Sequence, residues 1–209
     1  MSSPDIIQKA AQYVKSKQSG FKEAGHDWFH TLRVWKMAVR LAEQIKCDLT
    51  VVHLASLFHD IADAKFTGGE EMDGPAIARE WMQKEKIDPE IIEKVAHIIA
   101  NISWRKQHTA VLAKNPEFAI VQDADRLDAI GAIGIARAFS YGGFKSRPIF
   151  IPTSERNEFD PNNDTISHFY EKLLLLKETL NTAPAREIAR ERHQFMIAFL
   201  NQFNREQNC

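Results

Sequence analysis

The sequence has little that would tie it to a membrane, an oxidising compartment or a nucleic acid. It has two cysteines, Cys47 and Cys209, far apart and without Cys-x-x-Cys spacing, so neither a disulfide framework nor a thiolate metal site is indicated. No apolar stretch approaches the length of a membrane span, and the first ten residues lack the apolar core of a signal peptide. The formal net charge is −1, with no polybasic run. We therefore expect a cytoplasmic protein with no membrane or nucleic-acid partner.

The chain also lacks the alternating pattern and hairpin turns of β-structure, apart from a short candidate ribbon at 147–152. Apolar residues recur instead at helical spacing. Helix starts are marked by a capping residue next to a proline: Ser3-Pro4, Asp88-Pro89, Asn115-Pro116 and Thr182 with Pro184. With 209 residues, 44% hydrophobic and 26% charged, the chain predicts an all-α fold of about eight helices around one core, in a single domain 1–209.

Two stretches interrupt the helical pattern. Residues 64–74 and 141–163 are rich in glycine, proline or polar residues and are expected to be loops that either cover a pocket or only connect helices. Beyond residue 164, apolar runs at 173–176 and 195–200 indicate core helices or a homodimer surface.

Four dispersed residues form the most informative feature: His30, the dipeptide His59-Asp60, and Asp125. His30 lies in the first turns of a helix, His59 and Asp60 follow a nearly all-apolar helix, and Asp125 interrupts another apolar helix. Buried charged groups of this kind need a partner. Two imidazoles and two carboxylates suit one divalent ion such as Mn, Fe, Ni or Mg.

Each member also has a simpler interpretation. A histidine in an apolar run is usually a hydrogen-bonded core residue, and the set is informative only because its members occur together. His26-Asp27 is a second His-Asp pair, but Asp27 is placed to cap the helix that carries His30. We therefore favour His30 as the ligand, with His26 as a supporting or substrate-facing group. Asp123 is expected to face away from Asp125.

The segments that carry these residues, 30–34 (HTLRV), 57–63 (LFHDIAD) and 123–132 (DADRLDAIGA), resemble the HD superfamily of metal-dependent phosphohydrolases. The resemblance spans about residues 20–150, with helices of about 164–206 expected to pack on this core. The chain looks most like small single-domain bacterial HD proteins, some of which act as nucleoside triphosphate pyrophosphohydrolases. Signatures of the cyclic-dinucleotide phosphodiesterases and of the alarmone hydrolases are missing.

Two further groups of residues would serve phosphate hydrolysis. Asp63, three residues after Asp60, is a candidate to hold or deprotonate the attacking water, although a solvent-facing role is equally consistent. The candidates for phosphate binding are Arg33, Lys65, Lys145 and Arg147, with His26 beside the substrate. Arg126 adjoins Asp125 but points elsewhere on the helix, so a structural ion pair is the alternative.

These residues and the resemblance together imply a phosphohydrolase that acts on a small phosphorylated substrate. The resemblance favours conversion of a (deoxy)nucleoside triphosphate to the monophosphate and pyrophosphate. Two alternatives stay open: a nucleotide phosphomonoesterase, and a module that binds metal or nucleotide without turnover.

Overall fold

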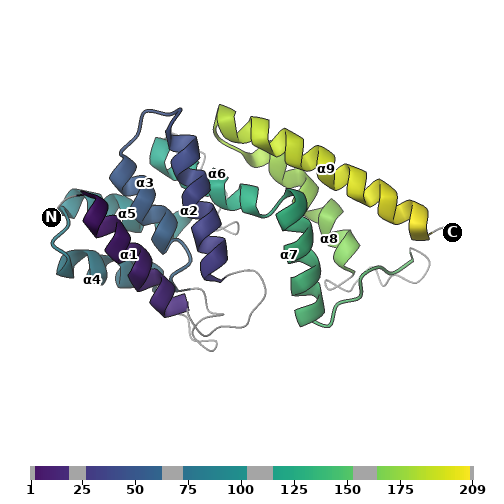
Figure 1. Cartoon of the computed structure of the whole chain (residues 1–209), viewed down its shortest axis with the longest axis horizontal. Coiled ribbons are helices and arrows are strands. Elements are labelled where there is room, and N and C mark those ends of the chain that lie inside the picture. The colour runs from purple at the N-terminus through teal and green to yellow at the C-terminus, as the bar shows by residue number, and fades with distance from the viewer. Residues whose placement is uncertain (1–2, 19–26, 63–72, 103–114, 153–163, 208–209) are drawn as a thin grey trace. The chain divides into compact units, whose positions relative to one another are not determined.

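The structure is a computed structural model that describes residues 3–18, 27–62, 73–102, 115–152 and 164–207 (Figure 1). Within these ranges the chain forms α-helices and one 3-10 helix and contains no strand, which confirms the all-α prediction. Residues 147–152, the candidate ribbon, form no regular element. No helix in the described part is long and apolar enough to cross a membrane. The chain divides into two compact units, 1–22 with 26–124 and 23–25 with 125–209.

The first unit is a cluster of helices around α3. Its elements are α1 (Ser3–Gln18), α2 (Trp28–Ala42), α3 (Leu49–Phe58), α4 (Gly74–Lys84), α5 (Pro89–Asn101) and most of α6 (Pro116–Asp128). Helix α3 contacts α1, α2 and α5, and α4 pairs with α5 (Figure 1). Almost all of α3 is buried, including Leu54, Leu57 and Phe58 with no exposed surface. The segment that leads to His59-Asp60 is therefore at the centre of this unit.

Side-chain caps begin several of these helices, because the first backbone N–H groups of a helix have no partner within it. The Asp27 carboxylate accepts from the His30 N–H at 2.9 Å, as the sequence predicts. Asp88 caps α5 through the Glu90 N–H, and Asn115 caps α6 through the Phe118 N–H, each at 2.8 Å. The cap at Asp27 thus fixes the helical turn on which His30 lies.

The second unit contains the end of α6, then α7 (Gly131–Phe144), α8 (Thr165–Glu171), the 3-10 helix η5 (Leu173–Thr179) and α9 (Ala183–Gln207). Helix α9 packs on α7 and η5, and α7 also contacts α8 (Figure 1). A ladder of aromatic rings joins α7, α8 and α9: Phe139 and Phe199 have centroids 5.9 Å apart, and Phe169 and Phe199 stack at 6.0 Å. Of the apolar runs expected near the end of the chain, Leu173, Leu176, Met196 and Leu200 are buried in this core, whereas Leu175, Phe195 and Ile197 are exposed.

The structure corrects the boundaries of both predicted loops. Residues 141–144 are the last turn of α7, so the second loop begins at Lys145 and not at Tyr141. Gly74, expected in the first loop, begins α4 with Asp73 as its cap. Tyr141-Gly142-Gly143 reads as a turn because glycine is a poor helix former. Gly142 is nevertheless buried in α7, and a Cβ atom at this position would clash with Oγ1 of Thr165 in α8. Residues 64–72 of the first loop and 153–163 of the second lie outside the described residues, whereas 145–152 are described and form no helix.

Candidate metal centre

Two helix ends bring His30, His59 and Asp60 together. His30 lies in the first turn of α2, and His59 and Asp60 directly follow the last residue of α3. Helices α2 and α3 pack against each other, so residues 29 and 30 positions apart in the sequence become neighbours. Both imidazoles are buried, with 0% and 1% of the side chains exposed, while Asp60 keeps 20%. Asp60 is thus the side of the cluster that solvent or a substrate can reach.

The three side chains form a nearly equilateral triangle of donor atoms. The Nε2 atoms of His30 and His59 are 3.2 Å apart. The Asp60 Oδ2 atom lies 3.3 Å from the first and 3.4 Å from the second. Ligand atoms that bind one divalent ion at about 2.1 Å are themselves separated by about 3.0–3.4 Å. The spacing of this triangle therefore fits one shared cation.

The hydrogen bond on the far side of the His59 ring sets its tautomer. Nδ1 lies 2.8 Å from the carbonyl oxygen of Ser56, an acceptor, so Nδ1 carries the proton and donates it. This leaves a lone pair on Nε2, which faces His30 and Asp60. Metal-ligating histidines are usually oriented in this way: the ring nitrogen that does not bind the metal donates a hydrogen bond to a carboxylate, a backbone carbonyl or water. Within the described residues, His30, His59 and Asp60 are the group of histidine, cysteine or acidic side chains whose ligand atoms lie close enough together to hold a metal ion.

Asp125 and Arg33, two further predicted site residues, are described by the structure but are not members of this cluster of three. Asp125, the predicted fourth ligand, is half-buried on α6 and belongs to the second unit, so its role stays a prediction. Arg33 lies on α2, one turn after His30, and is half-buried. Its placement on the helix that carries a candidate ligand agrees with a phosphate-binding role, which stays a prediction too.

The other predicted site residues are divided between the second unit and the undescribed ranges. Lys145 follows α7 and is exposed, with its ammonium 5.1 Å from the centre of the Phe144 ring. Arg147 is half-buried near His168 of α8. His26, Asp63 and Lys65 lie outside the described residues. Nothing in the geometry tests these five assignments.

Neighbours of Asp125 have structural contacts. The Arg126 guanidinium donates to the carbonyl of Thr179 in η5. Asp128 is buried and pairs with Arg137 of α7, with Nη1 and Oδ2 2.7 Å apart. Asp123 has no exposed surface. Of the three aspartates on α6, Asp125 is thus the half-exposed one and the most accessible to a ligand.

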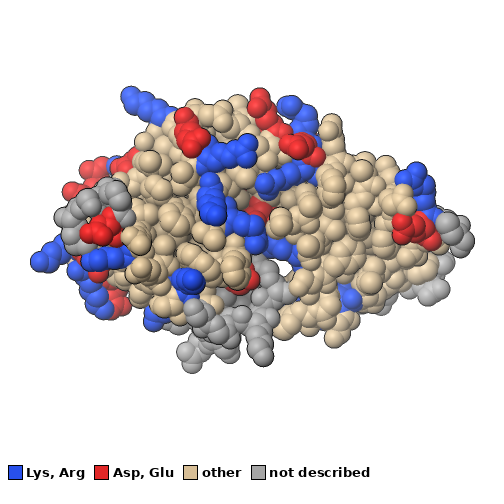
Figure 2. Space-filling model, in the orientation of Figure 1, with Lys and Arg blue, Asp and Glu red and all other residues tan. Residues whose placement is uncertain are grey.

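One pair of residues was missed by the sequence analysis. The indole N–H of Trp35 donates to Nδ1 of His53, 2.7 Å away, and both side chains line a pocket in the first unit. His53 has no metal-ligand pattern around it in the sequence, and the only signal was a histidine at the polar edge of an otherwise apolar helix. Both acidic and basic side chains occur on the face drawn in Figure 2, and the formal net charge of the whole chain is −1.

Known proteins resemble this chain along most of its length. A family model for the HD domain matches residues 28–130, the range that contains His30, His59, Asp60 and Asp125. The protein YpgQ of Bacillus subtilis is 38% identical over 188 residues, which cover 88% of this chain and 86% of YpgQ. The crystal structure of a Bacillus thuringiensis HD-superfamily hydrolase has 38% identity and a TM-score of 0.80 and covers both chains fully.

A structure of B. subtilis YpgQ in complex with ADP matches with 34% identity and a TM-score of 0.79, covering 96% of this chain and 97% of that one. The likeness extends beyond the family model to the C-terminal helices. The resemblance seen in the three sequence segments is confirmed. The chain belongs to the HD domain family, and it is a hydrolase of the HD superfamily.

Proposed function

We propose that the protein hydrolyses nucleoside or deoxynucleoside triphosphates to the monophosphate and pyrophosphate, with one divalent ion held by His30, His59, Asp60 and Asp125. The observation that carries the proposal is the triangle of donor atoms on α2 and α3, with edges of 3.2, 3.3 and 3.4 Å. The ADP complex of the relative YpgQ supports a nucleotide that has more than one phosphate.

The residues of the cluster have separate tasks in this proposal. His59 is oriented by the Ser56 carbonyl, and His30 is held by the first turn of α2, which Asp27 caps. Asp60 supplies a negative charge at the exposed edge. A divalent ion held by these residues would acidify a water molecule and withdraw charge from a phosphoryl oxygen. Because the two imidazoles are buried and fixed, little reorganisation is needed to hold the ion in place.

The substrate is expected to react at its α-phosphorus. Water attacks this atom, the bond to the oxygen that bridges to the β-phosphorus breaks, and pyrophosphate leaves. Asp63 is proposed to accept the proton of the attacking water. Arg33, Lys65, Lys145 and Arg147 are proposed to bind the phosphates, and His26 to face the substrate. A guanidinium on the same helix as a ligand, as Arg33 is, suits a non-bridging phosphate oxygen.

Two other activities use the same residues. A phosphomonoesterase would release inorganic phosphate from a nucleoside monophosphate. A module that binds metal and nucleotide without turnover would leave substrate intact. The buried, oriented imidazoles agree with either, so the reaction products have to decide.

The full chain should be incubated with dATP and manganese, and the products separated by chromatography. We expect dAMP and pyrophosphate in equal amounts, and loss of both in Asp60→Asn. Stepwise release of inorganic phosphate would replace the proposal with the phosphomonoesterase. Intact dATP with every divalent ion tried, together with stoichiometric metal binding, would favour the binding module.

A further inference from the structure

The first unit has a cavity whose lining includes none of the three residues of the metal cluster. It is about 650 Å³ in volume and lies between α1, α2 and the start of α3. Trp28 and Trp35 of α2, Ile7 and Lys15 of α1, and Leu49 and His53 of α3 are among its lining residues. The lining is mainly apolar, and the volume is that of a site for a small organic molecule.

The pocket and the metal cluster occupy different faces of the same two helices. At 100° per residue, Trp28 and Trp35 are seven positions apart and share one face of α2. His30 is five positions before Trp35, which places it about 140° away around the helix. His53 and His59 are six positions apart, about 120° from each other around α3. Neither His30, His59 nor Asp60 lines the pocket.

A hydrogen bond inside the pocket fixes the tautomer of His53. Because Nδ1 accepts the indole N–H of Trp35 at 2.7 Å, the ring proton is on Nε2. The two rings meet edge to face, with centroids 5.9 Å apart. Burial also lowers the pKa of His53, which keeps the ring neutral at neutral pH. Among the described residues none bonds Nε2, and this atom is not one of the buried polar atoms that lack a partner, so its N–H can donate to water or to a ligand in the pocket.

The charge of the lining residues indicates which charge a ligand of this pocket would carry. With His53 neutral, Lys15 is the charged member among the described lining residues, and none of them is acidic. Two indoles provide flat apolar surface, which favours an aromatic ring. An anionic oxygen would accept the Nε2–H of His53 and be attracted by the Lys15 ammonium.

We propose that this pocket binds a flat aromatic molecule that carries one carboxylate or sulfonate. The rings lie against Trp28 and Trp35, and the anionic group bonds to His53. The site is separate from the proposed catalytic reaction and does not depend on it.

The experiment is an NMR titration of the full, ¹⁵N-labelled chain with 2-naphthoate as the probe. The indole N–H signal of Trp35 should move and saturate. Trp81 is the internal control, because its ring packs between Tyr13 and Phe58, away from the pocket, with centroids 5.7 and 5.3 Å apart. No saturable shift at Trp35, or equal shifts at both indoles, would overturn the proposal.

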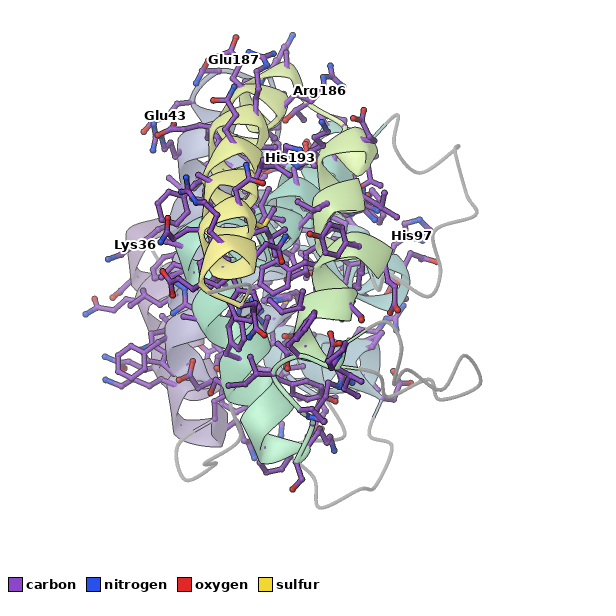
Figure 3. The ribbon with its side chains drawn as sticks, turned by 90° about the vertical axis from the view of Figure 1, so that its right-hand side faces the viewer. Lys36, Glu43, His97, Arg186, Glu187 and His193 are labelled. Carbon is purple, nitrogen blue, oxygen red and sulfur yellow. The ribbon has the colours of Figure 1, made fainter. Side chains whose placement is uncertain are left out.

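Variants test the polar contacts. His53→Leu removes the donor and should weaken 2-naphthoate binding about tenfold or more, as expected for a hydrogen bond to a charged group. Lys15→Gln is a change on the surface of α1 that does not endanger the fold, and it should weaken binding as well. Lys36→Gln is the matched control: Lys36 is an exposed lysine of α2 that does not line the pocket (Figure 3).

A neutral probe tests the charge. The amide 2-naphthamide has the same rings and an acceptor oxygen but no charge, and we expect it to bind more weakly than 2-naphthoate to the wild type. The difference should shrink in Lys15→Gln. Equal binding of both probes to the wild type, or unchanged 2-naphthoate binding in both His53→Leu and Lys15→Gln, would rule out the proposed anion site.

Discussion

The two ring nitrogens of His59 have different surroundings. Nδ1 donates to a carbonyl inside α3, while Nε2 faces His30 and Asp60. A lone pair that points at a second imidazole nitrogen 3.2 Å away is repulsive unless a proton or a cation lies between them. A divalent ion resolves this for both rings at once and also neutralises Asp60. The three donor atoms, each within 3.4 Å of the others, thus suit a shared cation.

The first prediction concerns the fourth ligand. Asp125→Asn should remove most of the bound manganese, because an amide oxygen is a weaker ligand than a carboxylate. Asp123→Asn, two residues earlier on α6 and fully buried, keeps the volume of its side chain and should leave metal content near normal. Metal analysis of the purified variants measures both. The reverse ranking would show that the assignment within α6 is wrong.

The second prediction concerns Asp63. Asp63→Asn keeps the shape of the side chain and removes its basicity, so kcat should fall by about 10²-fold or more if it accepts a proton in the reaction. Metal content should stay that of the wild type, which separates this role from that of a ligand. Steady-state kinetics with dATP measures the effect. An unchanged kcat would leave Asp63 without a catalytic role.

The third prediction is a pH dependence from the second unit. Burial, together with the positive charges of Lys172 and Arg147, lowers the pKa of His168 to about 4. In the unfolded chain His168 titrates near 6.5. Between these values the unfolded state binds a proton that the folded state does not, so the free energy of unfolding falls as the pH drops from about 6.5 to about 4. Above pH 6.5 this contribution is constant.

His168→Gln removes this titration. The decrease in the free energy of unfolding between pH 7.5 and pH 4.5 should be smaller in the variant than in the wild type, as measured by urea unfolding at both pH values. His97→Gln, a change at an exposed histidine of α5, is the control and should retain the full decrease (Figure 3). An equal decrease in His168→Gln and the wild type would show that protonation of His168 is not its cause.

Helix starts could be predicted from the sequence because they depend on local chemistry. Asp27, Asp88 and Asn115 each accept a hydrogen bond from an N–H two or three residues later, as their positions indicate. His30 and the pair His59-Asp60 could also be singled out from the sequence, because His30 lies at the start of a helix and His59-Asp60 at the end of one. Local signals suffice where one turn of helix determines the position of a side chain.

Features that depend on contacts between helices could not be predicted. The pocket that contains Trp35 and His53 exists only because α1, α2 and α3 pack together, and none of its lining residues is unusual in sequence. The end of α7 was placed too early for the same reason. Gly142 is poor for a helix by itself, but it allows close approach to Thr165 of α8, a residue 23 positions later.

The fourth prediction tests two glycines of α7. Gly131 begins the helix with φ of 77°, a conformation that L-residues rarely adopt, and a Cβ atom there would lie 2.9 Å from Cγ of Arg192 on α9. Arg192 is itself held by a hydrogen bond to the Leu127 carbonyl at 2.6 Å. Gly131→Ala should therefore lower the free energy of unfolding by about 1 kcal/mol or more.

Gly143 is the matched control in the same helix. No described atom lies within 4 Å of a Cβ built there, so Gly143→Ala should leave the free energy of unfolding unchanged or raise it by up to about 1 kcal/mol. Urea unfolding of both variants gives the comparison. If Gly131→Ala were as stable as Gly143→Ala, the strain assigned to the start of α7 would be absent.

At the scale of the whole molecule, the family model and the compact units have different boundaries. The HD model ends at residue 130, shortly after the second unit begins at Asp125. The structure of the B. thuringiensis hydrolase, however, matches the entire chain. Helices α7 to α9 are thus shared with relatives, although they are not part of the HD motif. The single domain 1–209 and a homodimer stay predictions.

The last prediction links the metal centre to the stability of the whole chain. An ion that binds the folded state and not the unfolded state stabilises by about 2.7 kcal/mol when present at 100 times its Kd. For a chain of this size, that corresponds to a rise in Tm of about 5–10 °C. Manganese should produce this rise in the wild type, and EDTA should reverse it. Asp60→Asn should lose most of the rise, because it removes a carboxylate from the cluster. His97→Gln should keep it, since His97 is an exposed histidine outside the cluster. The quantity to compare is the change in Tm on adding metal and not Tm itself, so a variant that is less stable without metal still gives a valid result.

A full rise in Tm of the Asp60→Asn variant on adding manganese would place the ion elsewhere in the molecule. It would also remove the basis of the proposed reaction.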